Sequence, residues 1–320
     1  MDNERPLPIG VLLGPTASGK TELSIELAKR LRAEIVSADS IQLYRGMDIG
    51  SAKPTLAQRQ GIPHHLLDAV DIGEPAFSVA AYQKMAAQAI QDIAARGKFS
   101  LIVGGTGLYI NALTYPLSFT EIPADAALRQ TLTAQEAQAP GSLHQRLLVV
   151  DPASAARLHP NDTKRLVRAL EVYTLTGKPI GALGGDFANA AKAPIPYTPR
   201  MVGLTMAREQ LYARIEARVD AMMQSGLLEE VRRLVSLGYT PDMPAMQGLG
   251  YKQLYRYLQG EYALAEAVET IKRETRRFAK RQMTWFKRDA RIHWLDTAAL
   301  TWTQLVEEAL RVLEGEEGGA

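Results

Sequence analysis

A phosphate-binding loop stands near the start of this chain. Residues 14–21 read Gly-Pro-Thr-Ala-Ser-Gly-Lys-Thr, which is a complete G-x-x-x-x-G-K-[ST] pattern. Its glycines let backbone N–H groups turn inward around an anion, and the following helix adds the positive end of its dipole. Lys20 adds a point charge, and the Thr21 hydroxyl is placed to hold Mg²⁺. We therefore expect a polyphosphate to contact Gly14, Pro15, Thr16, Ala17, Ser18, Gly19, Lys20 and Thr21.

Asp39 is the second residue with chemical potential, because it follows a short apolar run, 34–38, at the expected end of a strand. A carboxylate beside a phosphate loop can hold magnesium, or it can act as a general base on a bound acceptor. An aspartate followed by serine is also common as a helix cap or in a turn. The position alone leaves these three interpretations open.

Arg214 and Arg218 lie four residues apart on an expected helix, so they share one face. Two guanidinium groups in register suit a diphosphate, since their forks match phosphate oxygens. The alternative is a solvated face, on which Glu216 and Asp220 form ordinary ion pairs. Taken alone, the pattern favours the solvated face.

The chief basic concentration runs from 272 to 288 and holds eight cations and one acid. Ile271, Phe278 and Trp285 recur at seven-residue spacing, so we expect them to pack inward and leave a positive ridge outside. A second basic cluster lies at 164–168. Since the whole chain is nearly neutral, with a net charge of +2, these clusters favour an extended nucleic acid as partner over a free nucleotide.

The elements that must position these residues alternate between strand and helix. Apolar runs at 8–13, 34–38 and 99–103 read as buried strands, and an alanine-rich helix is expected from 78 to 96. Continuous apolar strands that alternate with helices predict an α/β fold of the P-loop NTPase kind, with a parallel sheet and helices on both faces. Ligands of such sheets bind at the carboxyl ends of the strands.

The composition changes after residue 114. We expect an all-helical insertion domain at 115–195, inside a catalytic core formed by 1–114 and 196–320. Its helices should begin at Asp151-Pro152 and after Asn161. The stretch 181–194 is poor in bulky residues and is expected to be a mobile linker. Beyond it we expect one more strand near 201–204, followed only by helices, at 209–237, 250–258, 263–288 and 303–313.

The composition also excludes several classes of protein. The chain has no cysteine, so disulfides and thiolate metal sites are ruled out. The adjacent pair His64-His65 has no supporting carboxylate or histidine spacing and is assigned to structure rather than to metal binding. The polar N-terminus is no signal peptide, and no apolar run reaches the ~20 residues of a membrane span. We expect a soluble cytoplasmic protein, and a monomer.

Seven segments together resemble the bacterial tRNA dimethylallyltransferases, which are also called tRNA isopentenyltransferases. The resemblance covers nearly the whole chain in order and spacing. The matching segments are GPTASGKT (14–21), SADSIQLYRGMDIGSAKP (37–54), PHHLLD (63–68), VGGTGLY (103–109), HPNDTKRLVRALE (159–171), LGYKQ (249–253) and KRQMTWFK (280–287).

The resemblance implies a donor, an acceptor and several roles. The loop would hold dimethylallyl diphosphate with Mg²⁺, and the acceptor would be the exocyclic amine of the adenosine next to the tRNA anticodon. Asp39 matches the general base, Thr106 a threonine near the reaction centre, and Arg218 the arginine that engages the diphosphate. Lys20 would assist the departure of the diphosphate, and Arg214 would help to bind it.

The resemblance further implies contacts with the tRNA anticodon stem-loop. The matching positions are Asp39, Ser40, Ile41, Gln42, Thr106, Arg129, Lys164, Arg165, Arg168, Gln247, Gly250, Tyr251, Lys252, Lys280, Arg281, Gln282, Trp285 and Lys287. Two positions depart from the family pattern: Gln247 stands where some members carry arginine, and Ser51 stands where threonine is usual.

Two other functions compete with this one. A P-loop kinase of a nucleoside or nucleotide would use Asp39 to hold magnesium, but it has no need of two basic surfaces. A nucleic-acid-binding module that only senses nucleotide leaves Asp39 and Thr106, at adjacent strand ends, without a purpose.

Overall fold

The computed structural model describes residues 6–74, 77–117, 119, 122–183 and 195–315. The chain forms two compact units. The first contains Met1–Phe77, Tyr82–Thr114 and Pro196–Ala320, and the second contains Ser78–Ala81 and Tyr115–Ile195.

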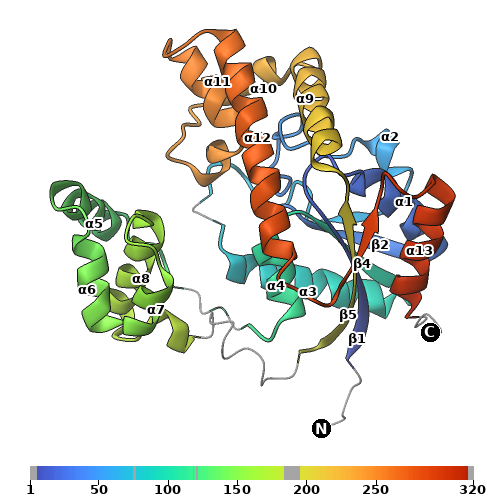
Figure 1. The fold of residues 1–320 in the computed structure, drawn as a ribbon, viewed down its shortest axis with the longest axis horizontal. Helices are drawn as coiled ribbons and strands as arrows, with labels where there is room; N and C mark the ends of the chain where they lie inside the picture. Colours follow the sequence, from blue (N-terminus) through green and yellow to red (C-terminus); the bar gives the residue numbers. More distant parts are fainter. Residues whose placement is uncertain (1–5, 75–76, 118, 120–121, 184–194, 316–320) are drawn as a thin grey trace. The chain divides into compact units, whose positions relative to one another are not determined.

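The first unit is built on one six-stranded sheet in which every paired neighbour is parallel (Figure 1). The strand order is β3-β2-β4-β1-β5-β6. The strands are β1 (Leu7–Leu13), β2 (Ala33–Ala38), β3 (His64–His65), β4 (Phe99–Gly104), β5 (Tyr197–Thr205) and β6 (Ile292–Asp296). The central strand β1 pairs with β4 and β5, for example through Val11, which lies opposite Ile102 and Met201. A parallel sheet of buried strands was predicted and is confirmed.

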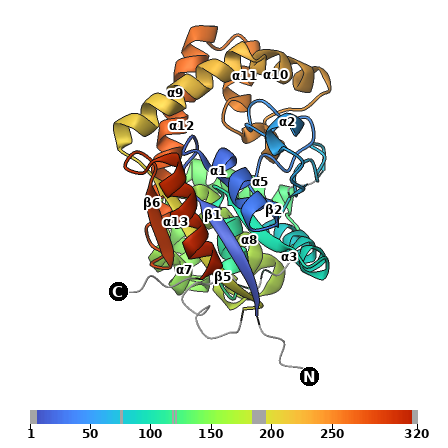
Figure 2. The same cartoon turned by 90° about the vertical axis from the view of Figure 1, so that its right-hand side faces the viewer.

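Helices cover both faces of the sheet, as predicted. On one face lie α1 (Lys20–Arg30) and α13 (Trp302–Glu314), and on the other lie α3 (Val79–Ala95) and α4 (Gly107–Thr114) (Figures 1 and 2). The Ser78 hydroxyl accepts a hydrogen bond from the N–H of Ala81, so it caps α3 as its sequence position predicted. Side chains of α1, α13 and the central strands form one core, which includes Leu12, Leu27 and Leu313.

Most of the remaining helices of this unit lie beyond the carboxyl ends of the strands, and the far end of α12 reaches α4 (Figures 1 and 2). They are α2 (Leu56–Arg59), α9 (Arg208–Gln224), α10 (Leu227–Ser236), the short 3₁₀ helix η3 (Pro244–Gln247), α11 (Tyr251–Leu258) and α12 (Leu264–Phe286). The long helix α12 packs against both α9 and α11. It thereby brings the chief basic segment of the sequence to the functional edge of the sheet.

Two expectations for this unit were wrong, and one short strand was not predicted. The segment 209–237 is two helices rather than one, because Gly226 adopts a left-handed conformation (φ 97°) between α9 and α10. The C-terminal part is not purely helical, since Ile292–Asp296 adds strand β6 beside β5. The two histidines form the short edge strand β3 beside β2. These short strands carry polar residues and depend on pairing with distant neighbours.

The second unit is a small helical bundle. It contains α5 (Ala126–Gln138), α6 (Ser142–Val150), α7 (Pro152–Arg157), α8 (Thr163–Thr176) and the 3₁₀ helix η1 (Ile180–Leu183). Leu132, Leu143, Leu147, Leu166 and Leu170 lie in its core. Asp151 caps α7, and Gly177 ends α8, as expected, but the residue that caps α8 is Asp162 rather than Asn161. Of the expected linker, 181–183 belongs to η1, and 184–194 lies outside the described residues.

In the part of the chain that the structure describes, every helix is too short or too polar to cross a lipid bilayer.

Candidate active site

The phosphate loop connects β1 to α1, as predicted. Gly14 and Gly19 have φ angles of 151° and 95°, in the region that favours glycine, and Ala17 also has a positive φ of 64°. A Cβ atom on Gly14 would lie 2.9 Å from the carbonyl oxygen of Leu204, so the neighbouring strand β5 also requires glycine there. The loop therefore turns its backbone tightly at the N-terminus of α1, where an anion is favoured.

Lys20 bends back over this loop. Its Nζ donates hydrogen bonds to the carbonyl oxygens of Gly14, at 3.0 Å, and Pro15, at 2.7 Å. Burial of the ammonium group, with the nearby positive charge of Arg218, lowers the pKa of Lys20 to about 7, against a smaller opposing effect of Asp39. A phosphate group in the loop would reverse this shift, because it would supply the negative charge that the ammonium lacks.

Asp39 lies directly after β2, and its carboxylate is held from one side. Its Oδ1 accepts hydrogen bonds from the backbone N–H groups of Ile41, at 2.9 Å, and Gln42, at 3.2 Å. Among the described residues, none bonds to Oδ2. The turn interpretation and a chemical role are therefore compatible, because one oxygen orients the group and the other stays available.

Thr106 follows β4, the neighbour of β2, and lies beside the Asp39 turn. Its N–H donates to the carbonyl oxygen of Ala38, and its Oγ1 accepts from the N–H of Ser40, both at 3.0 Å. The two strand ends come this close because Gly104 has no side chain: a Cβ atom there would lie 2.1 Å from the Ala38 oxygen. Thr106 thus fixes the backbone next to Asp39.

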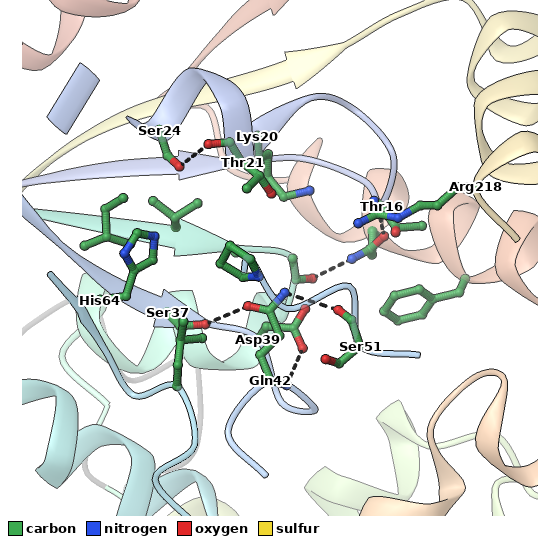
Figure 3. A pocket seen from close by; sticks show the side chains of 18 residues that line it. Thr16, Lys20, Thr21, Ser24, Ser37, Asp39, Gln42, Ser51, His64 and Arg218 are labelled. Atoms are coloured by element: carbon green, nitrogen blue, oxygen red, sulfur yellow. Dashed lines mark hydrogen bonds between the residues drawn. The ribbon is translucent and has the colours of Figure 1, made fainter. Parts of the chain in front are cut away.

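Lys20 and Asp39 line one pocket at the carboxyl edge of the sheet, whereas Thr106 is not among the residues that line it (Figure 3). Lys20, Asp39 and Arg218 are its charged residues. Burial lowers the pKa of Arg218, and the Asp39 carboxylate opposes that effect. The walls also contain Thr16, Thr21, Ser24, Ile35, Ser37, Gln42, Ser51, Pro54, His64, Leu67, Val103, Gly104, Gly105, Phe278 and Gln282. The sequence argument did not name the apolar residues Pro54, Leu67 and Phe278 as site residues, although Pro54 and Leu67 lie within the matching segments 37–54 and 63–68.

A second hollow lies beside the loop. It is lined by Ala17, Ser18, Gly19, Lys20, Thr21, Glu22, Arg214 and Arg218. Arg214 and Arg218 therefore share the face of α9 that lines this hollow, where Arg214 is exposed and Arg218 is partly buried. The acids Glu216 and Asp220 form ion pairs with Arg276 and Lys272 of α12. Two guanidinium groups and the loop amides can surround a diphosphate here.

Gln282 was expected at the tRNA surface, but its side chain is buried between two parts of the site. Its Oε1 accepts from the N–H of Thr16, and its Nε2 donates to the carbonyl oxygen of Gly105, both at 2.9 Å. Trp285, one turn further along α12, lies against Gly107, where a Cβ atom would be 2.4 Å from the indole. The inner face of α12 therefore holds the loops of the site in place.

The buried residues of α12 also correct the expected seven-residue stripe. They are Ala267, Ile271, Ala279, Gln282 and Phe286. Phe278 and Trp285 are only partly buried, and Phe278 lines the pocket. The inner face follows ordinary helical spacing rather than a heptad.

The basic ridge of α12 divides into paired and unpaired cations. Arg277 forms an ion pair with Glu274 at 2.8 Å, and Lys272 and Arg276 are paired with acids of α9. Over the described residues, no carboxylate lies within ion-pair distance of four exposed cations near the end of α12: Lys280, Arg281, Lys287 and Arg288. Unpaired positive charge is thus concentrated near the C-terminal end of the helix.

The segment 247–252 contains one exposed and several enclosed positions. Gln247 is exposed and Lys252 is partly exposed, so both are accessible. Gly250 is buried, with φ 91°, and the Tyr251 side chain is fully buried. The Tyr251 hydroxyl donates to Glu230 Oε1 at 2.7 Å, so this side chain offers nothing to an external partner.

The second unit places its expected contact residues in two groups. Arg129 and Arg168 both bind the completely buried Glu171, with closest distances of 2.7 Å and 2.6 Å. They therefore serve the interior of the bundle as well as its surface. Lys164 and Arg165 are exposed on α8, and Arg165 pairs with the neighbouring Asp162.

The histidine pair forms structural contacts, and His64 also lines the pocket of the site. His65 Nε2 lies 2.7 Å from Glu34 Oε2, and His64 Nδ1 lies 2.8 Å from the carbonyl oxygen of Ile62. Burial lowers the pKa of His64. The described residues contain no cluster of three or more acidic, histidine or cysteine side chains that could hold a metal ion.

Comparison with known proteins identifies the family. The family model described as IPP transferase matches residues 42–289. A tRNA dimethylallyltransferase of Symbiobacterium thermophilum is 52% identical over 309 residues, which cover 96% of this chain and 95% of that protein.

Solved structures agree with this result. The full-length tRNA isopentenylpyrophosphate transferase of Bacillus halodurans matches with a TM-score of 0.72 and 42% identity, over 96% of each chain. A eukaryotic dimethylallyltransferase acting on tRNA matches with a TM-score of 0.79 and 29% identity, over 96% of this chain and 79% of that one. The chain described here therefore belongs to the tRNA dimethylallyltransferase family.

Proposed function

We propose that this protein transfers the dimethylallyl group of dimethylallyl diphosphate to the exocyclic amine of the adenosine next to the anticodon of tRNA. One observation carries the proposal: a phosphate loop, two partly buried cations and a carboxylate with one available oxygen line the same pocket. The family membership selects the reaction that this combination serves.

The donor binds through its diphosphate. Backbone N–H groups of the loop, Lys20 and the arginines of α9 surround the phosphate oxygens. Negative charge grows on the diphosphate as its bond to the dimethylallyl carbon breaks, so fixed positive groups at that point accelerate the reaction. The apolar wall formed by Pro54, Leu67 and Phe278 suits the hydrocarbon part of the donor.

The acceptor amine needs help, because its lone pair is delocalised into the adenine ring. In the transfer, the nitrogen forms a bond to the dimethylallyl carbon, the carbon–oxygen bond breaks, and diphosphate leaves with the bonding electrons. Asp39 Oδ2 takes the proton that the nitrogen loses. The hydrogen bonds of Oδ1 to Ile41 and Gln42 keep the carboxylate oriented for this step.

Thr21 fits the requirements of a magnesium ion bound together with the donor. Mg²⁺ needs oxygen ligands and is usually held by few protein groups together with substrate phosphates and water. Thr21 lies on both hollows beside the loop, where its hydroxyl can complete such a set. The ion would neutralise charge on the leaving diphosphate.

The RNA reaches the site along positively charged surface. The unpaired cations of α12 suit phosphate groups, whereas the side chains of Gln282 and Tyr251 use their hydrogen bonds inside the protein. The target base must leave its stack to reach Asp39, which costs a few kcal/mol. Backbone contacts along α12 and α8 offset this cost and set the register of the stem.

A labelling experiment tests the proposal against a kinase. The protein is incubated with unmodified tRNA and dimethylallyl diphosphate labelled in its hydrocarbon part, with and without ATP. We expect label in the RNA, on the adenosine next to the anticodon, without any need for ATP. Release of ADP in proportion to product, or a strict requirement for ATP, would overturn the proposal.

A further inference from the structure

Glu230 is a buried carboxylate to which the reaction assigns no direct role. It lies on α10, and only 8% of its surface is exposed. Its Oε2 accepts from the N–H groups of Asp48 and Ile49, at 3.0 and 2.9 Å, and its Oε1 accepts from the N–H of Gly50 at 3.2 Å. The Tyr251 hydroxyl gives Oε1 a further bond at 2.7 Å. Four donors thus converge on one carboxylate.

The surrounding contacts make this junction rigid. Gly50 lies close to Tyr251, where a Cβ atom would be 2.6 Å from the ring. Arg233, one turn along α10, donates to the carbonyl oxygen of Gly46 at 2.7 Å. Burial, reinforced by the negative charge of Glu230, raises the pKa of Tyr251, so its hydroxyl stays a donor. Helices α10 and α11 therefore hold residues 46–50 from one side.

The held segment leads directly to the catalytic carboxylate. The next residues, Ser51 and Ala52, accept hydrogen bonds from Nε2 of Gln42, at 3.2 and 3.3 Å. The backbone N–H of Gln42 in turn donates to Asp39 Oδ1. Hydrogen bonds and the covalent chain between them therefore connect Glu230 through residues 48–52 and Gln42 to Asp39.

We propose that Glu230 is a positioning residue for the acceptor half of the site: by anchoring residues 48–50 it fixes Gln42 and, through it, the Asp39 carboxylate. This inference rests on the proposed function, in which Asp39 takes the proton of the acceptor amine. The donor half of the site is outside this path, because within the described part of the chain Lys20, Arg214 and Arg218 share no hydrogen bond with the anchored segment.

The anchor predicts a particular kinetic pattern for Glu230→Gln. The amide keeps one acceptor oxygen but turns an NH₂ group toward donors, so at least one hydrogen bond to a charged group is lost. We expect kcat/KM for tRNA to fall by about tenfold or more, while the dissociation constant of a donor analogue stays within about twofold of the wild-type value. If the substitution only destabilised the fold, a smaller fraction of the enzyme would be active. The KM for tRNA and the dissociation constant of the donor analogue would then stay unchanged.

Glu229→Gln is the matched control. Glu229 is adjacent on α10 but 66% exposed, and its ion pair is with the exposed Arg232 of the same helix. Tyr251→Phe removes one of the four donors and should change kcat/KM in the same direction by a smaller factor, so the inference stays testable if Glu230→Gln fails to fold. Wild-type kcat/KM in folded Glu230→Gln, or a parallel loss of donor affinity, would overturn it.

Amide hydrogen exchange separates this inference from the proposed function. In Glu230→Gln the N–H groups of 48–50 and Gln42 should exchange faster than in Glu229→Gln, whatever reaction the protein catalyses. Unchanged exchange at these amides refutes the anchor. If these amides exchange faster in Glu230→Gln but the wild-type protein transfers no dimethylallyl group, the proposed function is refuted and the anchoring role of Glu230 is kept.

Discussion

The side-chain oxygen of Gln282 accepts a hydrogen bond from the backbone N–H of Thr16 at 2.9 Å. These residues are 266 positions apart, so the phosphate loop near the start of the chain is completed by a helix near its end. The other end of the same amide holds Gly105, beside Thr106. One buried side chain therefore couples the shape of the loop to the shape of the neighbouring strand end.

Replacing Gln282 by methionine should weaken donor binding. The substitution keeps the volume but leaves the Thr16 N–H and the Gly105 carbonyl without their partner, at a cost of about 1–3 kcal/mol for each unsatisfied group. We expect the donor KM to rise by about tenfold or more. Steady-state kinetics with donor varied and tRNA saturating will measure this. Lys280→Met, on the exposed side of the same helix, is the control, and an unchanged donor KM in Gln282→Met would contradict the role.

Donor affinity should depend on pH through Lys20. With its pKa lowered to about 7, the free enzyme loses the Lys20 charge as pH rises above that value, whereas the diphosphate complex keeps it. The dissociation constant of an unreactive donor analogue should therefore rise by up to about tenfold per pH unit above neutrality. Calorimetric titrations from about pH 6 to about pH 9 will test this. If the dissociation constant of Lys20→Met rises with pH as steeply as that of the wild type, the pH dependence belongs to another group.

The lowered pKa of Lys20 also affects the free energy of unfolding. Donor affinity should fall as the pH rises, whereas the contribution of Lys20 to stability should increase. The unfolded chain, in which lysine has a pKa near 10.4, binds more protons than the folded protein between about pH 7 and 10. Lys20 therefore contributes stability that increases with pH across this window. Denaturant titrations of wild type and Lys20→Met at both ends of the window should show the difference between the two proteins shrinking at the higher pH.

Asp39→Asn should separate chemistry from binding. The amide can still cap the turn at Ile41 and Gln42, but it cannot take the proton of the acceptor amine. We expect the single-turnover rate to fall by ~10²–10⁴, with little change in tRNA affinity. A magnesium series on the same variant distinguishes the two roles of the carboxylate. Recovery of the rate at high magnesium would show that Asp39 holds the ion instead.

The unpaired cations of α12 should set the salt dependence of tRNA binding. Alanine at Lys280, Arg281 and Lys287 should reduce the slope of log K against log salt by about 0.7–0.9 for each phosphate that the variant no longer neutralises. Arg277→Ala is a matched control, because Arg277 is exposed on the same helix but already paired with Glu274. Filter binding at several salt concentrations measures the slopes. Equal slopes for the triple variant and wild type would remove α12 from the RNA surface.

Acid should loosen the second unit through Glu171. Burial alone would raise the pKa of this carboxyl, but the hydrogen bonds from Arg129, Arg168 and the N–H of Asp125 outweigh it and hold the pKa below its usual range. Its stabilising contribution is complete above the unfolded-state pKa, near 4.3, and is lost as the pH falls through the lower folded-state value. Glu171→Gln should lower the melting temperature at neutral pH and flatten its dependence on acid. Arg165→Ala, at an exposed position of the same helix, is the control. If its melting temperature also stopped depending on acid pH, the effect could not be assigned to Glu171.

The general fold followed from local patterns, and its exceptions followed from distant contacts. Apolar runs predicted β1, β2, β4 and β5 to within a few residues, because buried parallel strands are continuously hydrophobic. The strand Ile292–Asp296 was missed, since its sequence, IHWLD, is short, contains the polar residues His293 and Asp296, and becomes a strand only beside β5. Strand order could not be read from the sequence, because it depends on which distant segments pair.

The candidate site followed from its motifs, and its supporting residues did not. The spacing predicted the loop, and Asp39 and Arg218 do line the pocket with it, but their chemical roles stay predictions. Glu230 and its neighbour Glu229 look equivalent in sequence, although only Glu230 falls on the buried stripe of α10, with Leu227 and Leu234. Reading polar residues on apolar helical stripes as anchors would have found both Glu230 and Gln282.

The position of β5 in the sheet has a consequence for biosynthesis. This strand pairs with β1 on one side and β6 on the other, yet it follows the whole helical insertion in the sequence. As the nascent chain leaves the ribosome, β1, β2, β4 and their helices can form a partial sheet whose β1 edge stays open until residues 197–205 emerge. An open apolar edge is a site for aggregation, so a chaperone that shields Leu7–Leu13 during synthesis would raise the yield of folded protein.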